Sequence, residues 1–561
     1  MAYELDEVLE ELGRFGKYQA FTFIYITVPI IFHVITGLSF IFTAGTVEHR
    51  CHVPGCEADW SSGGLELEPR WLRYAVPHET RAGALRPTRC LAYARANDND
   101  TDTDTAAPDG ECPASLFSND TLRCEHWVFE NPRATIAGEW DITCDENQWK
   151  LTLVGTVNSV GYFVTTPIAG YASDRFGRKT VLLYAVGLSA LVGIARSFSP
   201  NYIVFIIMEF VDMVCGGSVY ETAYVLGMEQ VGPSARVLAS AIMGAVDVIG
   251  EILLGFLAWL LQDWRMLLRI AYLPGFIMVS CYWWILPESV RWLMVNGRAS
   301  DANVIIQKAA KQNGVDLSEK AIKRMQLAQK TAPVHDDIHG TDSTDDSCKT
   351  GKVDAIVQVM HSSTLMVRLF VCCFCWGTNM FVFYGLSLYS VAMAGNKYLN
   401  FMLVSLIELP GCLAAYYALE RMGRRVTLST SFLLAAVACL AFTVVPPDMQ
   451  TVRILLYLVG KFGITISYSA IHVYATELFP TQIRHLMIGT CTMVGGAGEM
   501  AAPQAPLLVA YAEWLPVAVF GAMALASGLL ALIFPETKNT RLPDTIHEAE
   551  DIGRSEPNTV V

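Results

Sequence analysis

Long apolar runs recur along the whole chain, and they constrain its fold more than any other feature. A helix of about 20 residues crosses the roughly 30 Å of hydrocarbon in a bilayer, and it satisfies its own backbone hydrogen bonds there. The composition agrees, because 53% of the 561 residues are hydrophobic and only 17% are charged, against about 25% charged residues in a typical soluble protein. We therefore predict an all-α membrane protein with twelve transmembrane helices, at residues 21–44, 151–171, 180–196, 202–228, 237–262, 265–286, 367–392, 397–419, 426–446, 453–476, 485–511 and 513–535.

The short loops between these helices predict the orientation. An excess of Lys and Arg marks cytoplasmic loops, and the segments DRFGRK (174–179) and ERMGRR (420–425), the segment after residue 286, and Lys17 all fall on one side. Both termini are then cytoplasmic. The expected organisation is a cytoplasmic N-terminal segment (1–20), the first transmembrane helix (21–44), an extracellular domain (45–150), the rest of the first six-helix bundle (151–286), a cytoplasmic helical and disordered loop (287–366), the second six-helix bundle (367–535) and a cytoplasmic tail (536–561).

The long outer loop is rich in cysteine. An even number of cysteines in a segment with almost no apolar core favours three disulfides in an oxidising compartment, and six cysteines allow fifteen pairings. A zinc site is the alternative, but the paired CxxC or HxxxH spacing that it needs is missing, so no metal is expected. Two glycosylation sequons, at Asn99 and Asn119, fall in the same loop. The cysteines are Cys51, Cys56, Cys90, Cys112, Cys124 and Cys144.

Three charged motifs occur twice at nearly the same offset. DRFGRK recurs as ERMGRR 246 residues later, EQVGPSAR (229–236) recurs as ELFPTQIR (477–484) after 248, and PESVRWL (from 287) recurs as PETKNTRL (from 535) after 248. Each copy lies at the same end of a corresponding helix. The chain is therefore predicted to consist of two six-helix halves in a parallel repeat.

The same motifs resemble those of a known family. The pattern GxxxDRxGRK at 170–179 is similar to the loop signature of the major facilitator superfamily. Within it, GEWDITC (138–144), the Cys-rich outer loop, PESVRWL and ELFPTQIR resemble the organic cation, organic anion and carnitine transporters of solute carrier family 22. The resemblance implies a major facilitator fold and a polyspecific plasma-membrane carrier of small organic ions.

The repeated charges suggest a cytoplasmic gate. Opposite charges at a partly dry helix mouth attract more strongly than in water, so the clusters would close this side while the site faces outward and break when it faces inward. Basic residues that only hold the loops inside are the alternative. The gate residues are Asp174, Arg175, Arg178, Glu229 and Arg236 in the first half, and Glu420, Arg421, Arg424, Glu477 and Arg484 in the second.

Acidic residues outnumber basic ones inside the predicted helices. Ionisable groups there usually face a cavity or a partner. The acids are Glu209, Asp212, Glu221, Asp247, Glu251, Glu408 and Glu499, against few bases such as Arg368 and Lys461. Asp247 and Glu251 share one helix face because they are four residues apart. This balance suits an organic cation or the amine end of a zwitterion.

Aromatic rings complete the predicted binding site, because ring faces attract ammonium groups. The resemblance implies that Tyr162, Tyr220, Tyr224, Asp247, Trp376 and Phe383 line a central cavity, although rings at helical spacing also pack in cores or membrane-interface belts. The full set of candidate substrate-binding residues is Asn158, Tyr162, Tyr220, Tyr224, Asp247, Glu251, Trp376, Asn379, Phe383, Tyr384, Tyr468, Ser469, His472 and Glu499.

The chain departs from the family pattern at informative positions. Cation carriers have acids at the positions of Gly496 and Ser469, and anion carriers have an Arg at the first of these. Glu499 lies about one turn from Gly496 and could replace the missing acid. Cys412 stands four residues after Glu408, where anion carriers have a Lys, so anionic substrates are disfavoured. His472 could bind substrate or form a hydrogen bond between helices.

These observations predict a plasma-membrane transporter of small organic cations or zwitterions, such as carnitine-like or carcinine- and beta-alanine-like amines and xenobiotic cations, by alternating access. An organic anion transporter of the same family and a carrier-derived receptor are the alternatives. No enzyme motif such as GxSxG or HExxH occurs. No cofactor is expected, although Na⁺ or H⁺ coupling through Glu251, Glu499 or His472 stays open. The partners are substrate and lipid rather than nucleic acid, with a weak match to a PDZ-domain ligand in the C-terminal NTVV.

Overall fold

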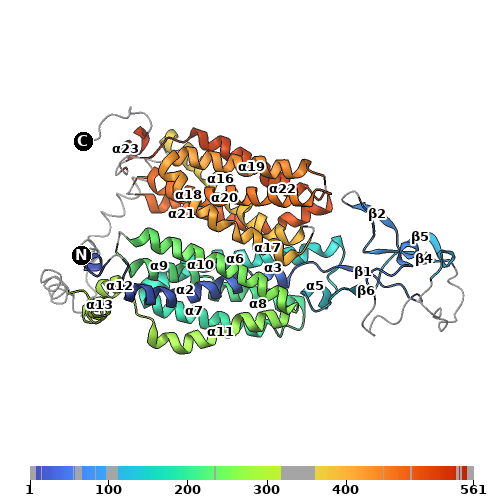
Figure 1. Ribbon diagram of the computed structural model, residues 1–561, viewed down its shortest axis with the longest axis horizontal. Helices are drawn as coiled ribbons and strands as arrows, with labels where there is room; N and C mark the ends of the chain where they lie inside the picture. Colours follow the sequence, from blue (N-terminus) through green and yellow to red (C-terminus); the bar gives the residue numbers. More distant parts are fainter. Residues whose placement is uncertain are drawn as a thin grey trace.

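Two helical bundles lie side by side in the computed structural model, and a small domain containing strands projects from one end of them (Figure 1). We call this the domain end; the opposite end carries α12, α13 and α23. The structure describes residues 8–13, 15–54, 56, 66–81, 84–96, 112–232, 235–316, 361–393, 395–446, 448–480, 483–538, 543 and 546–552.

Each bundle contains six helical passes, as the repeat predicts. The first half consists of α2 (Lys17–Gly37) with α3 (Phe40–Thr43), α6 (Gln148–Phe176), α7 (Arg178–Arg196), α8 (Tyr202–Gly216) with α9 (Val219–Glu229), α10 (Arg236–Leu261) and α11 (Trp264–Ile285). The second half consists of α16 (Ser363–Tyr389) with η5 (Ser390–Ala392), α17 (Lys397–Leu406) with α18 (Glu408–Met422), α19 (Arg424–Val444), α20 (Gln450–Leu478), α21 (Arg484–Ala501) with η6 (Ala502–Ala510), and α22 (Leu515–Leu530) with η7 (Ala531–Ile533).

Within the described residues, ten of these passes are long and apolar enough by themselves to cross a membrane. The other two contain α6 and α21, whose sequences are rich in Gly, Thr and Ser. Both lie inside the bundle, where α6 packs against α8 and α21 packs against α16. The twelve predicted helices are therefore all present.

Several passes that we predicted as continuous helices are broken. The run 202–228 divides between α8 and α9 at Gly217, and the run 397–419 divides between α17 and α18 just before Pro410. The run 485–511 changes to a 3₁₀-helix at Ala502, because Pro503 and Pro506 lack the N–H that an α-helix needs.

The projecting domain is made of three short antiparallel strand pairs. β1 (His49–Cys51) pairs with β6 (Trp127–Phe129), β2 (His78–Arg81) with β3 (Ala84–Pro87), and β4 (Leu91–Arg95) with β5 (Phe117–Arg123). The short helices are α4 (Leu72–Ala75), η2 (Ala114–Leu116), α5 (Ile136–Glu139) and η3 (Asp145–Asn147). The six cysteines pair as Cys51–Cys124, Cys56–Cys112 and Cys90–Cys144. Such cross-links stabilise a domain that has a small core.

The glycosylation sequons of this domain have different standings. Asn119 is exposed on β5, whereas Asn99 lies outside the described residues.

The GEWDITC motif attaches this domain to the first bundle. Glu139 accepts a hydrogen bond from the Trp264 indole (Nε1–Oε2, 2.7 Å) and forms an ion pair with Arg265 (Nη2–Oε1, 2.5 Å). Partial burial opposes ionisation, but these contacts lower the pKa of the Glu139 carboxyl below its usual value. Trp140 packs edge-on against Phe205 and Trp264.

The opposite end carries short helices. α12 (Val290–Val295) and α13 (Ala299–Asn313) pack against the N-terminal segment at Val8 and Leu9, and α23 (Ile546–Asp551) lies beside α16. Asn313 accepts a hydrogen bond from the Tyr18 backbone N–H (2.8 Å) and so ties α13 to the start of α2. The predicted polar segment 333–347 and the NTVV tail lie outside the described residues.

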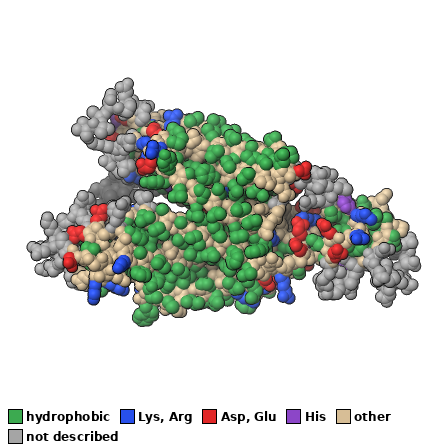
Figure 2. Space-filling view, in the orientation of Figure 1, with side chains coloured by type: hydrophobic (Ala, Val, Ile, Leu, Met, Phe, Trp, Pro, Cys, Tyr) green, Lys and Arg blue, Asp and Glu red, His purple; other side chains and the backbone are tan. Residues whose placement is uncertain are grey.

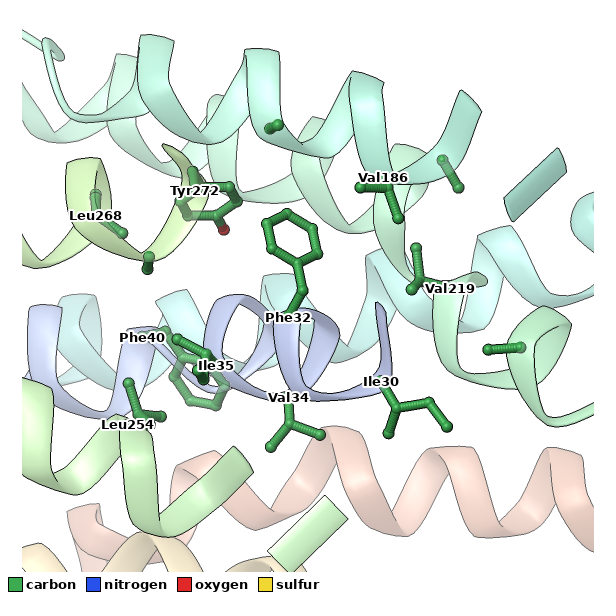
Figure 3. Packing of buried hydrophobic residues seen from close by; sticks show 14 of the residues in the cluster. Ile30, Phe32, Val34, Ile35, Phe40, Val186, Val219, Leu254, Leu268 and Tyr272 are labelled. Carbon is green, nitrogen blue, oxygen red and sulfur yellow. The ribbon is translucent and has the colours of Figure 1, made fainter. Parts of the chain in front are cut away.

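Each half has its own apolar core. In the first half, Phe32 of α2 points toward Tyr272 of α11, and the two rings meet edge-on at 6.0 Å (Figure 3). Hydrophobic side chains also cover the outer faces of both bundles, while charged side chains gather at the two ends (Figure 2). This distribution is that of a protein whose middle lies in hydrocarbon.

Candidate transport site between the two halves

The two halves meet at the domain end. There α10 packs against α17, and α6 packs against η6. Gln504 Nε2 donates to Thr156 Oγ1 at 2.7 Å, and Thr152 Oγ1 donates to Gln504 Oε1 at 3.1 Å. Toward the opposite end the surface is hollowed between the bundles (Figure 2). The interior between the halves is therefore closed at the domain end and opens toward α12 and α13.

Aromatic side chains from both halves line this interior. Tyr220 and Tyr224 stack one turn apart on α9, with ring centroids 6.2 Å apart. Across the interface, the Tyr468 ring lies 5.0 Å from Phe383 and 4.8 Å from His472. These five side chains are only partly buried. The sequence predicted all of them as site residues, and the structure brings them together.

One acidic group lies beside these rings. Glu221 of α9 accepts a hydrogen bond from the Tyr162 hydroxyl at 3.0 Å. Glu499 of α21 lies close enough to Glu221 to interact with it electrostatically, and Tyr384 adjoins Glu499. The pair therefore brings two carboxyl groups together from opposite halves, as Glu499 was expected to do in place of an acid at Gly496.

A second acidic group lies deeper in the interface. Asp247 and Glu251 of α10 face Glu408 of α18, and Lys461 of α20 pairs with Glu408 (Nζ–Oε1, 2.8 Å). Lys461 Nζ also lies 3.3 Å from the centroid of the Phe383 ring. The two groups together place five carboxyl groups and one lysine ammonium at the interface. Its charge is strongly negative unless cations or protons bind.

Three predicted site residues have other surroundings. Asn158 donates to Glu209 Oε1 (2.8 Å) and to the Gly37 carbonyl (3.2 Å), so it lies within the packing of the first half. Asn379 Nδ2 donates to Ser467 Oγ at 2.6 Å inside the second half. Trp376 is buried against His472, with centroids 4.5 Å apart. Asn158 and Asn379 therefore support the helices instead of facing the interior.

Ser469 lies at the edge of the deeper acidic group. Its hydroxyl donates to the Thr465 carbonyl of the preceding turn at 3.4 Å, and its side chain is partly buried beside Cys412. It is placed to face the interior, although its hydroxyl is directed to its own helix.

A buried polar cluster in the first half is the main feature that the sequence analysis missed. Arg196, with 0% exposure, pairs with Glu209 and lies 3.4 Å from Asp212. Its guanidinium also donates to the hydroxyl groups of Tyr272 (2.9 Å) and Ser39 (3.0 Å). Glu209 and Asp212 are therefore committed to Arg196 and not to the interior. The clue was an Arg that ends one apolar run before two acids three residues apart in the next.

The predicted charge clusters form at the opposite end. Arg178 pairs with Asp174 (2.9 Å) and Glu229 (3.2 Å) in the first half. In the second half, Arg424 pairs with Glu477 at 3.1 Å. Because each pair joins helices of the same half, rigid rocking of the halves leaves it intact. The expectation that these pairs break during transport is therefore not required by the geometry.

The other predicted gate residues make different contacts. Arg175 donates to the Tyr171 hydroxyl (3.1 Å), Arg421 lies over the Tyr417 ring, and Arg484 donates to the Phe479 carbonyl (3.1 Å). The backbone carbonyl of Glu420 accepts a hydrogen bond from Lys538 at 2.7 Å, and Arg236 begins α10. These residues extend the clusters without adding a link between the halves.

A third charged residue in each half, which we did not predict, completes the cluster. Glu288 Oε1 accepts the Lys179 backbone N–H at 3.0 Å, and Glu536 Oε1 accepts the Arg424 N–H at 2.8 Å. Each carboxylate thus caps the N-terminus of α7 or α19, where the helix dipole favours a negative charge. The repeated PES and PET motifs could have indicated this role.

The comparisons with known proteins agree with this geometry. The model of the Major Facilitator Superfamily matches residues 133–503 and 399–555. The human "Organic cation/carnitine transporter 2" is 31% identical over 97% of this chain and 94% of its own length. The Drosophila melanogaster "Organic cation transporter protein" is 30% identical over 98% of this chain and 95% of its own.

A solved structure has the same fold. The xylose transporter XylE from E. coli, in its inward open conformation, aligns with a TM-score of 0.56 at 16% identity, over 74% of this chain and 91% of that chain.

A twelve-helix carrier with two repeated halves around a polar interior is the class that fold and site define. The chain belongs to the major facilitator superfamily and, within it, to solute carrier family 22. It is a multi-pass membrane transporter and not an enzyme.

Proposed function

We propose that this protein transports small organic cations, or zwitterions through their amine end, across the plasma membrane by alternating access. The observation that carries the proposal is the charge of the interior, where five carboxyl groups face one ammonium. The partly buried rings of Tyr220, Phe383 and Tyr468 offer faces that attract ammonium groups. Relatives named as organic cation and carnitine transporters support the same substrate class.

The charge balance argues against an anionic substrate. Lys461 is the buried base at the interface, and it is already bound to Glu408, Ser387 and the Phe383 carbonyl. An organic anion would therefore meet repulsion from four further carboxyl groups. Cations favour the site because desolvated opposite charges attract strongly.

The proposed orientation places the domain end outside the cell and both termini in the cytoplasm. The disulfides of the projecting domain fit an oxidising compartment. The Arg- and Lys-rich clusters at the opposite end fit the positive-inside rule. In this orientation the structure is closed to the outside and open to the cytoplasm.

In this proposal the charge clusters serve as struts instead of latches. Arg178 and Arg424 each tie the ends of two helices within one half, and Glu288 and Glu536 cap the next helix. A half that is held rigid at this end can rock as one body about the interface. A link to a PDZ domain at the C-terminus stays a separate and weak possibility of the sequence motif.

Uptake by cells that express the chain tests the proposal. Labelled tetraethylammonium, carnitine, carcinine and beta-alanine separate cation from zwitterion transport. We expect Asp247→Asn to raise the half-saturating concentration of a cation about 10- to 100-fold, because a charge-assisted contact contributes about 1.5–3 kcal/mol. Asp448→Asn, which changes an exposed acid at the domain end, is the matched control. Preferred uptake of an organic anion, or ligand-triggered signalling without any uptake, would overturn the proposal.

A further inference from the structure

Glu251 is a buried acid without a cation of its own. It lies on α10, one turn from Asp247 toward the domain end, and only 6% of it is exposed. Its Oε2 has no hydrogen-bond partner among the described residues. The hydroxyl of Ser405, which lies just before the break between α17 and α18, is its neighbour from the other half.

The charged groups around Glu251 do not neutralise it. Glu408 and Lys461 face it from α18 and α20, and Asp247 adjoins it on α10. Lys461 is already paired with Glu408 at 2.8 Å. From α2, which packs on the neighbouring Gly250, the facing residues are the apolar Ile31 and Val34. Three carboxyl groups therefore share one ammonium.

The three acids differ in how they can be neutralised. Glu408 has Lys461, and Asp247 is partly exposed to the interior, where water or the ammonium group of a substrate can reach it. Glu251 has neither. An isolated buried carboxylate is so unfavourable that the group binds a proton instead. A metal ion fits less well, because the described residues contain no cluster of three or more acidic, His or Cys ligands.

We propose that Glu251 is a proton-binding site and that the protein exchanges protons for organic cations. This inference rests on the proposed function and adds the ion that is exchanged. In the structure described here, closed at the domain end, the Glu251 carboxyl carries the proton. A substrate cation at Asp247, one helical turn away, stabilises the ionised form of Glu251 and so favours loss of the proton.

The position of Glu251 between the halves explains how its proton is released. Gly255, one turn further along α10, packs tightly against Phe401 and Met402 of α17. When the halves part at the domain end, α10 separates from α17 and α18, and water reaches the carboxyl group. The O–H bond of Glu251 then breaks, the proton passes to water, and the carboxylate stays on α10. Substrate and proton therefore bind in opposite states of the carrier.

Purified protein in lipid vesicles tests the exchange. The membrane potential is clamped with potassium and valinomycin, and tetraethylammonium uptake is measured with and without an acidic interior. One-for-one exchange predicts about tenfold accumulation for a gradient of one pH unit. A pH-sensitive dye inside the vesicles is expected to report alkalinisation when tetraethylammonium is added outside.

Variants assign the effect to this residue. Glu251→Gln is expected to bring the ratio of uptake with and without the gradient close to one, whatever its absolute rate. Glu251→Asp keeps a titratable group and is expected to keep the ratio above one, so the test holds if the amide variant is inactive. Asp448→Asn, remote from the interface, is expected to keep the full ratio.

Three results would overturn the proposal. The first is tetraethylammonium uptake that ignores the proton gradient in the unmodified protein, which leaves the transport function standing. The second is a gradient response that persists in Glu251→Gln, or a requirement for Na⁺ in place of protons. The third is absence of all organic cation uptake, which would also remove the proposed function.

Discussion

At the scale of single residues, this protein separates two uses of buried charge. In the first half, Arg196 is surrounded by Glu209, Asp212 and two hydroxyl groups, so its charge is neutralised within one bundle. At the interface, acids from both halves lie near each other with one lysine among them. The first arrangement holds helices together, and the second leaves charge available for a ligand.

Removing the basic member of the buried cluster should destabilise the first half strongly. Arg196→Ala leaves Glu209 and Asp212 buried without their cation, and breaking such a pair costs about 3–5 kcal/mol. We expect a large fall in the thermal unfolding temperature of the purified protein in detergent. The control is Arg269→Ala, which removes a partly buried Arg at the end of a neighbouring helix. Equal losses in the two variants would contradict the assigned role of Arg196.

The residue types of the site could be predicted better than their partners. Rings and acids inside apolar runs identified Tyr162, Tyr220, Tyr468, Asp247 and Glu499. The partner of a buried charge depends on how helices pack, which a single sequence does not contain. For this reason Asn158 and Asn379 were assigned to the interior, and Arg196 was missed.

At the scale of elements, the same corner is built twice. α6 and α7 meet at Gly177, with φ of +97°, and α18 and α19 meet at Gly423, with φ of +92°. Residues with a side chain rarely adopt this backbone conformation. The caps Glu288 and Glu536 lie directly against the two glycines. Each corner therefore combines a glycine, a capping acid and an Arg pair.

Substitution of the corner glycine should loosen the first half at this end. Gly177→Ala strains the backbone, at a cost of about 1–3 kcal/mol, and its Cβ would lie 2.4 Å from Glu288 Oε2. We expect a lower unfolding temperature and reduced transport. Gly170→Ala in α6 is the matched control, because its Cβ would meet no atom within 4 Å. A corner variant as stable and active as this control would show that the corner has no structural role.

Helices were predicted well because apolar length and repeated motifs are local features. Their breaks were predicted poorly. The interruptions at Gly217 and before Pro410 lie inside apolar runs, where hydropathy alone shows no boundary. The more polar α6 and α21 were placed correctly because the repeat required them.

At the scale of the whole molecule, transport depends on separation of the halves at the domain end. Thr152 and Gln504 are in contact there and belong to different halves. We expect that Thr152→Cys with Gln504→Cys, bridged by a short thiol-reactive cross-linker, stops cation uptake, and that each single variant treated with the reagent keeps it. Full uptake by the bridged double variant would exclude rocking about this interface.

The arrangement of the two halves followed from the offset of the motifs, but the state of the carrier did not. One sequence must fit both the outward and the inward arrangement, so it favours neither. Contacts such as Gln504 with Thr156 are needed to show which end is closed.

The central claim is that the acidic, ring-lined interior between the halves binds organic cations. Equilibrium binding of labelled tetraethylammonium to the purified protein tests it most directly. We predict saturable binding that is unaffected by an organic anion such as benzoate and is lost in Asp247→Asn combined with Glu499→Gln. Unchanged saturable binding in that double variant, at wild-type stability, would contradict the claim.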